Sequence, residues 1–179
     1  MMQFELNHAL DVLSRTPGVL RTLLAGLPAD WTERPYGPNT WSAKEVLAHL
    51  VYGERTDWIP RLQIILEHGD EKPFEPFDRT GHADLLASNT LGQLLDLFER
   101  ERADGLATLR GLNLGPADFE RRGRHPALGA VTLGNLLATW VVHDLNHIAQ
   151  ACKATAHQYR EAVGPWEQYL SILSPPNPR

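Results

Sequence analysis

Hydrophobic residues recur at three- and four-residue steps through four long stretches of this chain, which is the spacing of amphipathic helices. The stretches cover about residues 3–26, 42–66, 89–112 and 131–153. The segments between them contain prolines and glycines that regular helix does not tolerate. Residues 113–130 are predicted to form a loop or a short hairpin, and the chain has no convincing strand pattern. We therefore predict an all-α protein built as a four-helix bundle.

Breaks and caps refine the four predicted helices. Pro17 interrupts the first stretch, which we interpret as one kinked helix, and Pro60 should kink the second. The second helix should begin after Ser42, whose side chain can cap free N–H groups while Glu45 reaches back in a capping box. Thr132 is the predicted cap of the fourth helix.

The C-terminal part of the chain predicts a smaller addition to the bundle. An amphipathic piece around residues 166–173 indicates an extra short C-terminal helix. The last six or so residues, S-P-P-N-P-R, are predicted to form a flexible tail. At 179 residues, we expect residues 1–179 to form a single domain with a sizeable core.

Composition narrows the function classes without choosing one. Hydrophobic residues make up 42% and charged residues 22% of the chain, as is usual for globular proteins, and the net charge of -5 argues against nucleic-acid binding. No apolar run is long enough to span a membrane, and the N-terminus lacks the pattern of a secretion signal. The single cysteine, Cys152, fits a reducing compartment, so we expect a cytoplasmic protein.

Three histidines are the strongest candidates for chemistry. His143 and His147 lie four residues apart, so they are one turn apart on the fourth predicted helix. His49 falls on the inward face of the second predicted helix, one turn before Gly53. If these helices meet at the same level, three imidazoles converge and leave coordination positions open for water or substrate. That arrangement is typical of a catalytic metal site rather than a closed structural one.

Other polar residues receive weaker predictions. His68 and His82 lie in polar, turn-rich sequence where exposed histidines are common. The run of residues 99–102, E-R-E-R, is predicted to be an outward, solvated face of the third helix. Asp144 and Asn146 would either orient a ligand from an adjacent element or face solvent.

A metal-dependent reaction would also need a group that holds or deprotonates a metal-bound water. Glu54 and Asp57 follow His49 within about two turns, and Gln150 lies one turn beyond His147. Each of these three is therefore a candidate catalytic residue.

Two motifs carry a resemblance to a known family. W-S-A-K-E-V-L-A-H at residues 41–49 is followed by W-V-V-H-D-L-N-H-I-A-Q at residues 140–150. Together they resemble the DinB-like superfamily of metalloenzymes, which includes YfiT-type proteins and bacillithiol- and mycothiol-dependent S-transferases. The likeness extends over nearly the whole chain. It implies a four-helix bundle and a divalent metal, zinc or nickel in different members, held here by His49, His143 and His147.

The resemblance implies two reactions, and the residues do not choose between them. One is hydrolysis, and the other is transfer of a low-molecular-weight thiol onto a small-molecule electrophile, which we slightly favour. In either case the ion would lower the pKa of water or thiol and polarise the electrophile. Manganese and iron remain further options for the metal.

Two other interpretations stay open. The protein could bind a metal or ligand in a stress response without turnover, and a homodimer is compatible with that function. Alternatively, H-D-L-N-H at residues 143–147 could be a degenerate H-E-x-x-H zinc peptidase motif, with Glu161 or Glu167 as third ligand. Against the peptidase, Asp144 is one methylene shorter than the usual glutamate base, and no edge strand for a substrate is predicted.

Overall fold

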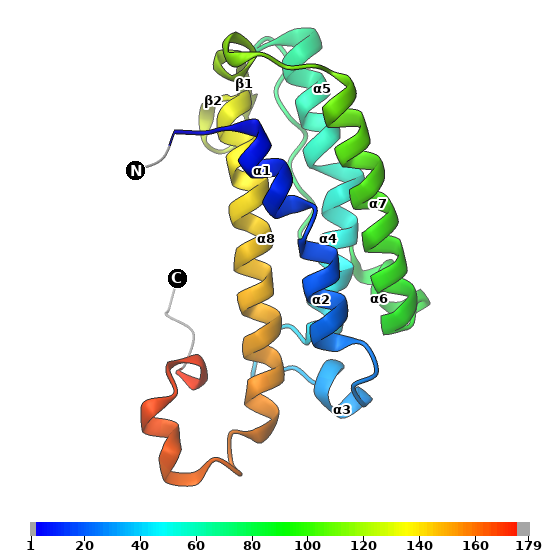
Figure 1. Ribbon diagram of the computed structural model, residues 1–179, viewed down its shortest axis with the longest axis vertical. Coiled ribbons are helices and arrows are strands. Elements are labelled where there is room, and N and C mark those ends of the chain that lie inside the picture. Colours follow the sequence, from blue (N-terminus) through cyan, green and yellow to red (C-terminus); the bar gives the residue numbers. More distant parts are fainter. Residues whose placement is uncertain (1–2, 175–179) are drawn as a thin grey trace.

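Four long helical columns form the body of the protein in a computed structural model, which describes residues 3–174 (Figure 1). The first column contains α1 (Leu6–Leu13) and α2 (Thr16–Leu24), and the second contains α4 (Ala43–Thr56) and α5 (Trp58–His68). The third and fourth are α7 (Leu91–Gly111) and α8 (Leu133–Ala156). This arrangement confirms the predicted four-helix bundle.

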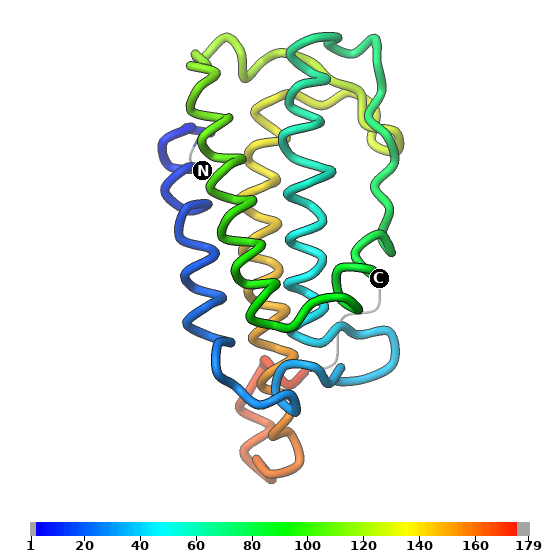
Figure 2. The backbone as a smooth tube through the Cα atoms, turned by 90° about the vertical axis from the view of Figure 1, so that its right-hand side faces the viewer, coloured from blue at the N-terminus to red at the C-terminus, as the bar shows by residue number. Residues whose placement is uncertain are grey.

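Short elements lie between and beyond these columns. They are α3 (Ala29–Thr32), α6 (Ala83–Ser88), the 3-10 helix η1 (Pro116–Glu120), strands β1 (Arg122–His125) and β2 (Gly129–Thr132), and the 3-10 helices η2 (His157–Tyr159), η3 (Gly164–Tyr169) and η4 (Ser171–Leu173). The C-terminal turns extend past the end of α8 and then fold back beside it, where Leu173 is buried and Lys153 Nζ donates to the carbonyl of Ser174 (Figures 1 and 2). The extra C-terminal helix is therefore a set of 3-10 turns, and residues 175–179 of the predicted tail lie outside the described residues.

The first two columns break where their sequences disfavour continuous helix. The prediction of one kinked N-terminal helix is wrong, because α1 ends before α2 begins at Thr16, with Pro17 in the first turn of α2. Proline is well tolerated there, since the first N–H groups of a helix have no partner within it. In the second column the break falls at Asp57, three residues before Pro60, which lies in the first turn of α5.

Side-chain caps set the starts of the long helices. The backbone N–H of Glu45 donates to Ser42 Oγ at 3.1 Å at the start of α4, as predicted. The other half of the predicted capping box is wrong, because the Glu45 side chain does not bond back to Ser42, and its Oε1 lies 3.5 Å from His82 Nε2 instead. Thr132 caps α8 in a reciprocal capping box with Asn135. These caps fix where α4 and α8 begin, and hence which of their side chains face the interior.

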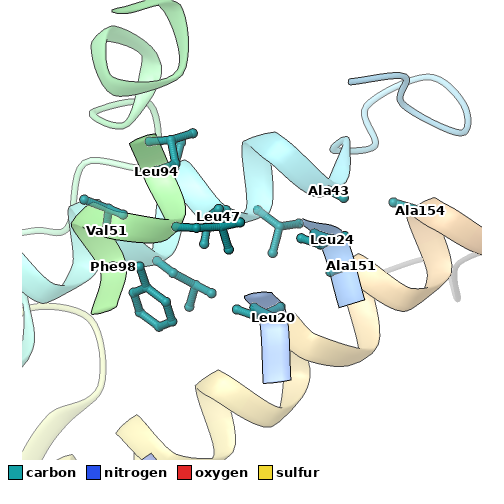
Figure 3. Close-up of a cluster of buried hydrophobic side chains, with 13 residues drawn as sticks. Leu20, Leu24, Ala43, Leu47, Val51, Leu94, Phe98, Ala151 and Ala154 are labelled. Atoms are coloured by element: carbon teal, nitrogen blue, oxygen red, sulfur yellow. The ribbon is translucent and has the colours of Figure 1, made fainter. Parts of the chain in front are cut away.

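The core consists of two apolar clusters at different levels of the bundle. One is shown in Figure 3 and includes Leu20 and Leu24 of α2, with Leu47 of α4 and Phe98 of α7. The other lies toward the hairpin and includes Trp140. In α7 the two clusters are separated by about two turns, which contain Arg102, and in α8 by the turns that contain the two histidines. A polar layer therefore crosses the middle of the bundle.

The β1–β2 hairpin is antiparallel and packs against α5, where Gly123 leaves no room for a side chain. A Cβ at Gly123 would lie 2.6 Å from Ile65 Cγ1 and 3.0 Å from Phe74 Cζ. We expect Gly123→Ala to lower the free energy of unfolding by about 1–3 kcal/mol through overpacking, as measured by urea denaturation. Gly111→Ala, where a Cβ meets nothing within 4 Å, is the matched control. An unchanged stability for Gly123→Ala would show that the hairpin can shift.

None of the helices formed by residues 3–174 is both long and apolar enough to cross a membrane.

Candidate metal centre

Three histidine side chains from two helices converge in the polar layer. His49 extends from α4, and His143 and His147 extend from α8. The Nε2 atom of His143 lies 3.2 Å from Nε2 of His49 and 3.1 Å from Nε2 of His147. Within the described part of the chain, these three form the only cluster of histidine, cysteine or acidic groups close enough to share an ion. The structure thus brings together the three predicted ligands.

The chemistry of this cluster fits a divalent metal ion. A neutral imidazole nitrogen offers either one hydrogen or one lone pair, so hydrogen bonding cannot fully satisfy His143 Nε2 toward two other ring nitrogens. Nitrogens about 2.0–2.1 Å from a shared ion are separated by about 2.9–3.4 Å for coordination angles between octahedral and tetrahedral. The separations of His143 Nε2 from the Nε2 atoms of His49 and His147 both fall inside that range. The three nitrogens therefore fit one ion.

Burial keeps the imidazoles in the form that binds metal. His49 and His147 are each 7% exposed, and His143 is half-buried. Burial, with a smaller contribution from neighbouring histidines, lowers the pKa of His49 to about 3 and the pKa of His143 to about 2. Both rings are therefore neutral at physiological pH, and no proton has to be displaced before a metal binds.

These lowered pKa values predict an acid-sensitive metal-free protein. At any pH between the ordinary histidine pKa of 6.5 and about 3, these histidines bind more protons in the unfolded chain than in the folded chain. Stability must then fall as pH falls, by at most about 1.4 kcal/mol per pH unit for each histidine. As the pH is lowered from about 7 to about 5, we expect the urea concentration at the denaturation midpoint of the metal-free protein to fall. A His49→Asn/His143→Asn variant should lose less stability over the same pH range. If it lost as much as the wild type, the acid sensitivity would not come from these two histidines.

Aromatic side chains surround the three imidazoles. The Trp41 ring lies 4.9 Å from the His49 ring and stacks on the His147 ring at 6.1 Å between centroids. The Trp58 ring meets the His143 ring edge-on at 5.0 Å. Such contacts restrict the ring orientations of the candidate ligands and exclude water from one side of the site.

Gln150 contacts the candidate ligand His147. Its Oε1 lies 2.7 Å from Nδ1 of His147. If Nε2 of His147 binds an ion, its Nδ1 carries the proton and donates it to this amide oxygen, which fixes the ring. The Nδ1 atoms of His49 and His143 have no such hydrogen-bond partner among the described residues. Gln150 therefore lies where it can orient a ligand.

The two predicted carboxylates lie in ion pairs. Glu54 is buried and accepts hydrogen bonds from Arg102 at 3.0 and 2.8 Å and from Trp140 Nε1 at 3.1 Å. Asp57 Oδ1 lies 2.6 Å from Arg61 Nε. In both cases burial outweighs the neighbouring arginine and raises the pKa of the carboxyl group. Their proposed catalytic role stays a prediction, but each carboxylate is held by an arginine.

Arg102 is the main residue that the sequence interpretation misplaced. The expected outward face of α7 is wrong at this position, because Arg102 is only 1% exposed and binds both Glu54 and Asp144. Asp144 is fully buried, whereas Asn146 faces solvent. The helical spacing from Leu95 and Phe98 to Arg102 could have indicated an inward position, but charged residues are rarely buried.

The other histidines and glutamates considered from the sequence differ in burial and in their distance from the centre. His68 is exposed, as expected, but His82 is only 4% exposed and its ring lies 5.6 Å from the His49 ring. The turn-rich sequence around His82 therefore gave the wrong expectation. Glu161 and Glu167 are absent from the described ligand cluster, in which His49 joins the helical pair instead. That geometry does not support the zinc peptidase interpretation.

A surface groove borders one of the candidate ligands. A shallow groove of about 520 Å³ runs over one face of α8 and includes the half-buried His143. Its other lining residues are uncharged: Asn135, Ala138, Thr139, Val142 and Asn146. Of the three candidate ligands, His143 is the one that lines this groove.

Comparisons with known proteins agree with this architecture. A protein from Oceanobacillus iheyensis named "Putative metal-dependent hydrolase" is 26% identical over 153 residues, covering 83% of this chain and 86% of the relative. A protein of the same description from Bacillus licheniformis is 29% identical over 147 residues, covering 81% and 82%.

The solved structure of YfiT from Bacillus subtilis, described as a probable metal-dependent hydrolase with an unusual four-helix bundle topology, has a similar fold. It superposes with a TM-score of 0.71 at 24% identity, covering 87% of this chain and 86% of that chain. At this identity the likeness establishes the fold. The family model of the DinB superfamily matches residues 13–151, which extend from α1 into α8 and include all three histidines. The chain therefore belongs to the DinB superfamily.

Proposed function

We propose that this protein is a metal-dependent hydrolase of small molecules, with one divalent ion held by His49, His143 and His147. The convergence of three Nε2 atoms from α4 and α8 carries this proposal. Three protein ligands leave coordination positions for water and substrate, as catalytic sites require. The names of the two bacterial relatives support hydrolysis. We propose zinc or nickel as the ion, because neutral imidazoles suit both.

The chain's own residues would prepare the site for this reaction. When bound, a divalent ion supplies a Lewis acid and lowers the pKa of water at neutral pH. His49 and His143 are neutral at physiological pH and so can offer a lone pair to an ion, and Gln150 accepts from His147 Nδ1 to hold its ring. Trp41 shields the imidazoles on one side. The uncharged groove beside His143 would admit a neutral small molecule.

Metal content and metal-dependent turnover test the proposal together. The protein is purified, its metals are measured by elemental analysis, and it is stripped with a chelator and reloaded with Zn²⁺, Ni²⁺, Mn²⁺ or Fe²⁺. We expect one ion per chain and hydrolysis of a panel of nitrophenyl esters and amides only after reloading. Replacing the exposed His8 with alanine should change neither result. A wild-type protein that retains no divalent ion at any tested concentration would refute the proposal.

Metal binding without turnover is the second candidate function. The observation that favours it is the pairing of Glu54 with Arg102 and of Asp57 with Arg61, which engages both nominated carboxylates. General acid or base catalysis needs a group free to exchange protons with substrate. Under this alternative, the metal-loaded wild type would show no hydrolysis or thiol conjugation above the uncatalysed rate, and Glu54→Gln, Asp57→Asn and Gln150→Leu would not differ from it. A selective loss in any one of them, in a folded and metal-loaded protein, would favour an enzyme.

We also propose small-molecule electrophiles, with a low-molecular-weight thiol as co-substrate, as partners to test. Adding bacillithiol or mycothiol with an electrophile to the reloaded protein separates thiol transfer from hydrolysis, because only transfer consumes thiol. The single cysteine supports a cytoplasmic location, where thiols stay reduced. A homodimer is tested by light scattering of the metal-loaded protein.

A further inference from the structure

Arg102 is a buried guanidinium whose donors are all used. It donates from Nε and Nη2 to Glu54 at 3.0 and 2.8 Å, and from Nη1 and Nη2 to Asp144 at 2.6 and 2.9 Å. A fifth hydrogen bond runs from Nη1 to the carbonyl of Leu13 at 2.8 Å. A guanidinium has five N–H donors, so this set satisfies every one of them. The side chain is therefore held in a single orientation.

These contacts join all four columns of the bundle at one point. Arg102 lies on α7, and its acceptors belong to α1, through Leu13, to α4, through Glu54, and to α8, through Asp144. The guanidinium also lies 4.9 Å from the Phe98 ring and 5.1 Å from the Trp140 ring. Planar stacking and paired hydrogen bonds fix a guanidinium more tightly than a flexible ammonium would be fixed.

The two carboxylates that Arg102 binds lie on the helices that carry the candidate ligands. Glu54 is five residues after His49 on α4, and Asp144 directly follows His143 on α8. A helix is rigid over so short a distance, so fixing Glu54 and Asp144 also fixes the height and rotation of the neighbouring histidines. A second connection runs through Trp140, which stacks on Trp58 at 5.7 Å, and Trp58 contacts the His143 ring.

A contribution to stability does not by itself explain why Arg102, Glu54 and Asp144 are buried together. Well-packed apolar residues of similar volume usually stabilise a fold as well as a buried ion network, or better. The network does specify how the helices are placed relative to one another, because its short, charge-assisted hydrogen bonds are directional and form in only one arrangement. Metal ligands must be placed to within a fraction of an ångström, and outer residues commonly provide that placement.

We propose that Arg102 is a positioning residue of the metal centre, which acts through Glu54 and Asp144 to hold His49 and His143 at the distance that one ion requires. The inference rests on the metal-binding function proposed above. It predicts that the shape of the guanidinium, and not only its charge, determines metal affinity.

Two substitutions separate position from charge. Arg102→Lys keeps the positive charge but loses the five-donor fork, whereas Arg102→Met removes both. We expect each folded variant to bind Co²⁺ and Zn²⁺ about tenfold or more weakly, as is common when an outer residue is lost. The visible absorption bands of bound Co²⁺ should shift, because they report the ligand geometry. Affinity is measured by chelator competition at a temperature where circular dichroism shows each variant fully folded.

The outcomes are distinct. If charge alone mattered, Arg102→Lys would bind normally and Arg102→Met would bind a dication more tightly, since two uncompensated carboxylates would remain. If Arg102 served only stability, both variants would melt earlier but show wild-type affinity and Co²⁺ spectra. Either result overturns the inference, and if Arg102→Met does not fold, Arg102→Lys decides alone. A wild type that binds no metal would instead refute the proposed function. Arg55→Lys, in a partly exposed pair with Glu101, is the matched control.

Discussion

Replacing His49 with alanine is expected to lower the affinity for Zn²⁺ or Ni²⁺ by about a hundredfold or more. Four-ligand zinc sites bind with about 10–16 kcal/mol, so one ligand contributes about 3 kcal/mol, and each 1.4 kcal/mol is tenfold. His49 is the ligand to test because it comes from α4, whereas the other two share α8. Chelator competition measures the affinity, and hydrolysis by the same samples should fall in parallel.

The control for this substitution is His8→Ala. The His8 side chain is 60% exposed, so its loss removes an imidazole from the chain without touching the polar layer. Circular dichroism should show both variants folded. If His49→Ala kept full metal occupancy at low metal concentration, the ion would be held by α8 and other groups, and the peptidase-like interpretation would regain support.

Replacing Arg102 with methionine should lower the free energy of unfolding of the metal-free protein by about 3–5 kcal/mol. The substitution leaves the carboxylates of Glu54 and Asp144 in the core without their cation, and the side chains of both are at most 2% exposed. Urea denaturation measures the loss. The loss should shrink at low pH, because burial already raises the pKa of Glu54, and the penalty for burying this carboxyl group without Arg102 falls on its charged form alone.

A surface pair provides the comparison for Arg102→Met. Arg55 lies 2.7 Å from Glu101, and the two side chains are 38% and 23% exposed. Exposed pairs contribute about 1 kcal/mol at most, so Arg55→Met should change stability little. Equal losses in the two variants would mean that the buried network is no more important to folding than a surface pair.

Much of the fold followed from local sequence rules. Apolar spacing predicted the long helices, and the caps at Ser42 and Thr132 predicted where α4 and α8 begin. The error at Pro17 has a local cause, because a proline can bend a helix or begin a new one and only the surroundings choose. The C-terminal segment forms short 3-10 helices rather than one α-helix because most of its apolar side chains stay exposed, with Trp166 69% exposed and Tyr169 80% exposed.

The candidate centre was predictable in part. The i, i+4 spacing of His143 and His147 placed them on one helix face, and the inward position of His49 made it a third candidate. Spacing could not indicate that Glu54 would turn toward Arg102, or that His82 would be buried beside His49. Those facts depend on residues that are 48 and 33 positions apart in the chain.

The sequence by itself determined the helices, their inward faces and the three imidazoles, because each depends on neighbours within a few turns of the same helix. Only the tertiary structure decided the height at which α4 meets α8, and so brought the three Nε2 atoms together. It also decided that Arg102 is buried, since a charged side chain enters a core only where partners from other helices compensate it. Local sequence patterns therefore identify the candidate ligands, but the geometry of the centre depends on contacts that cross the whole bundle.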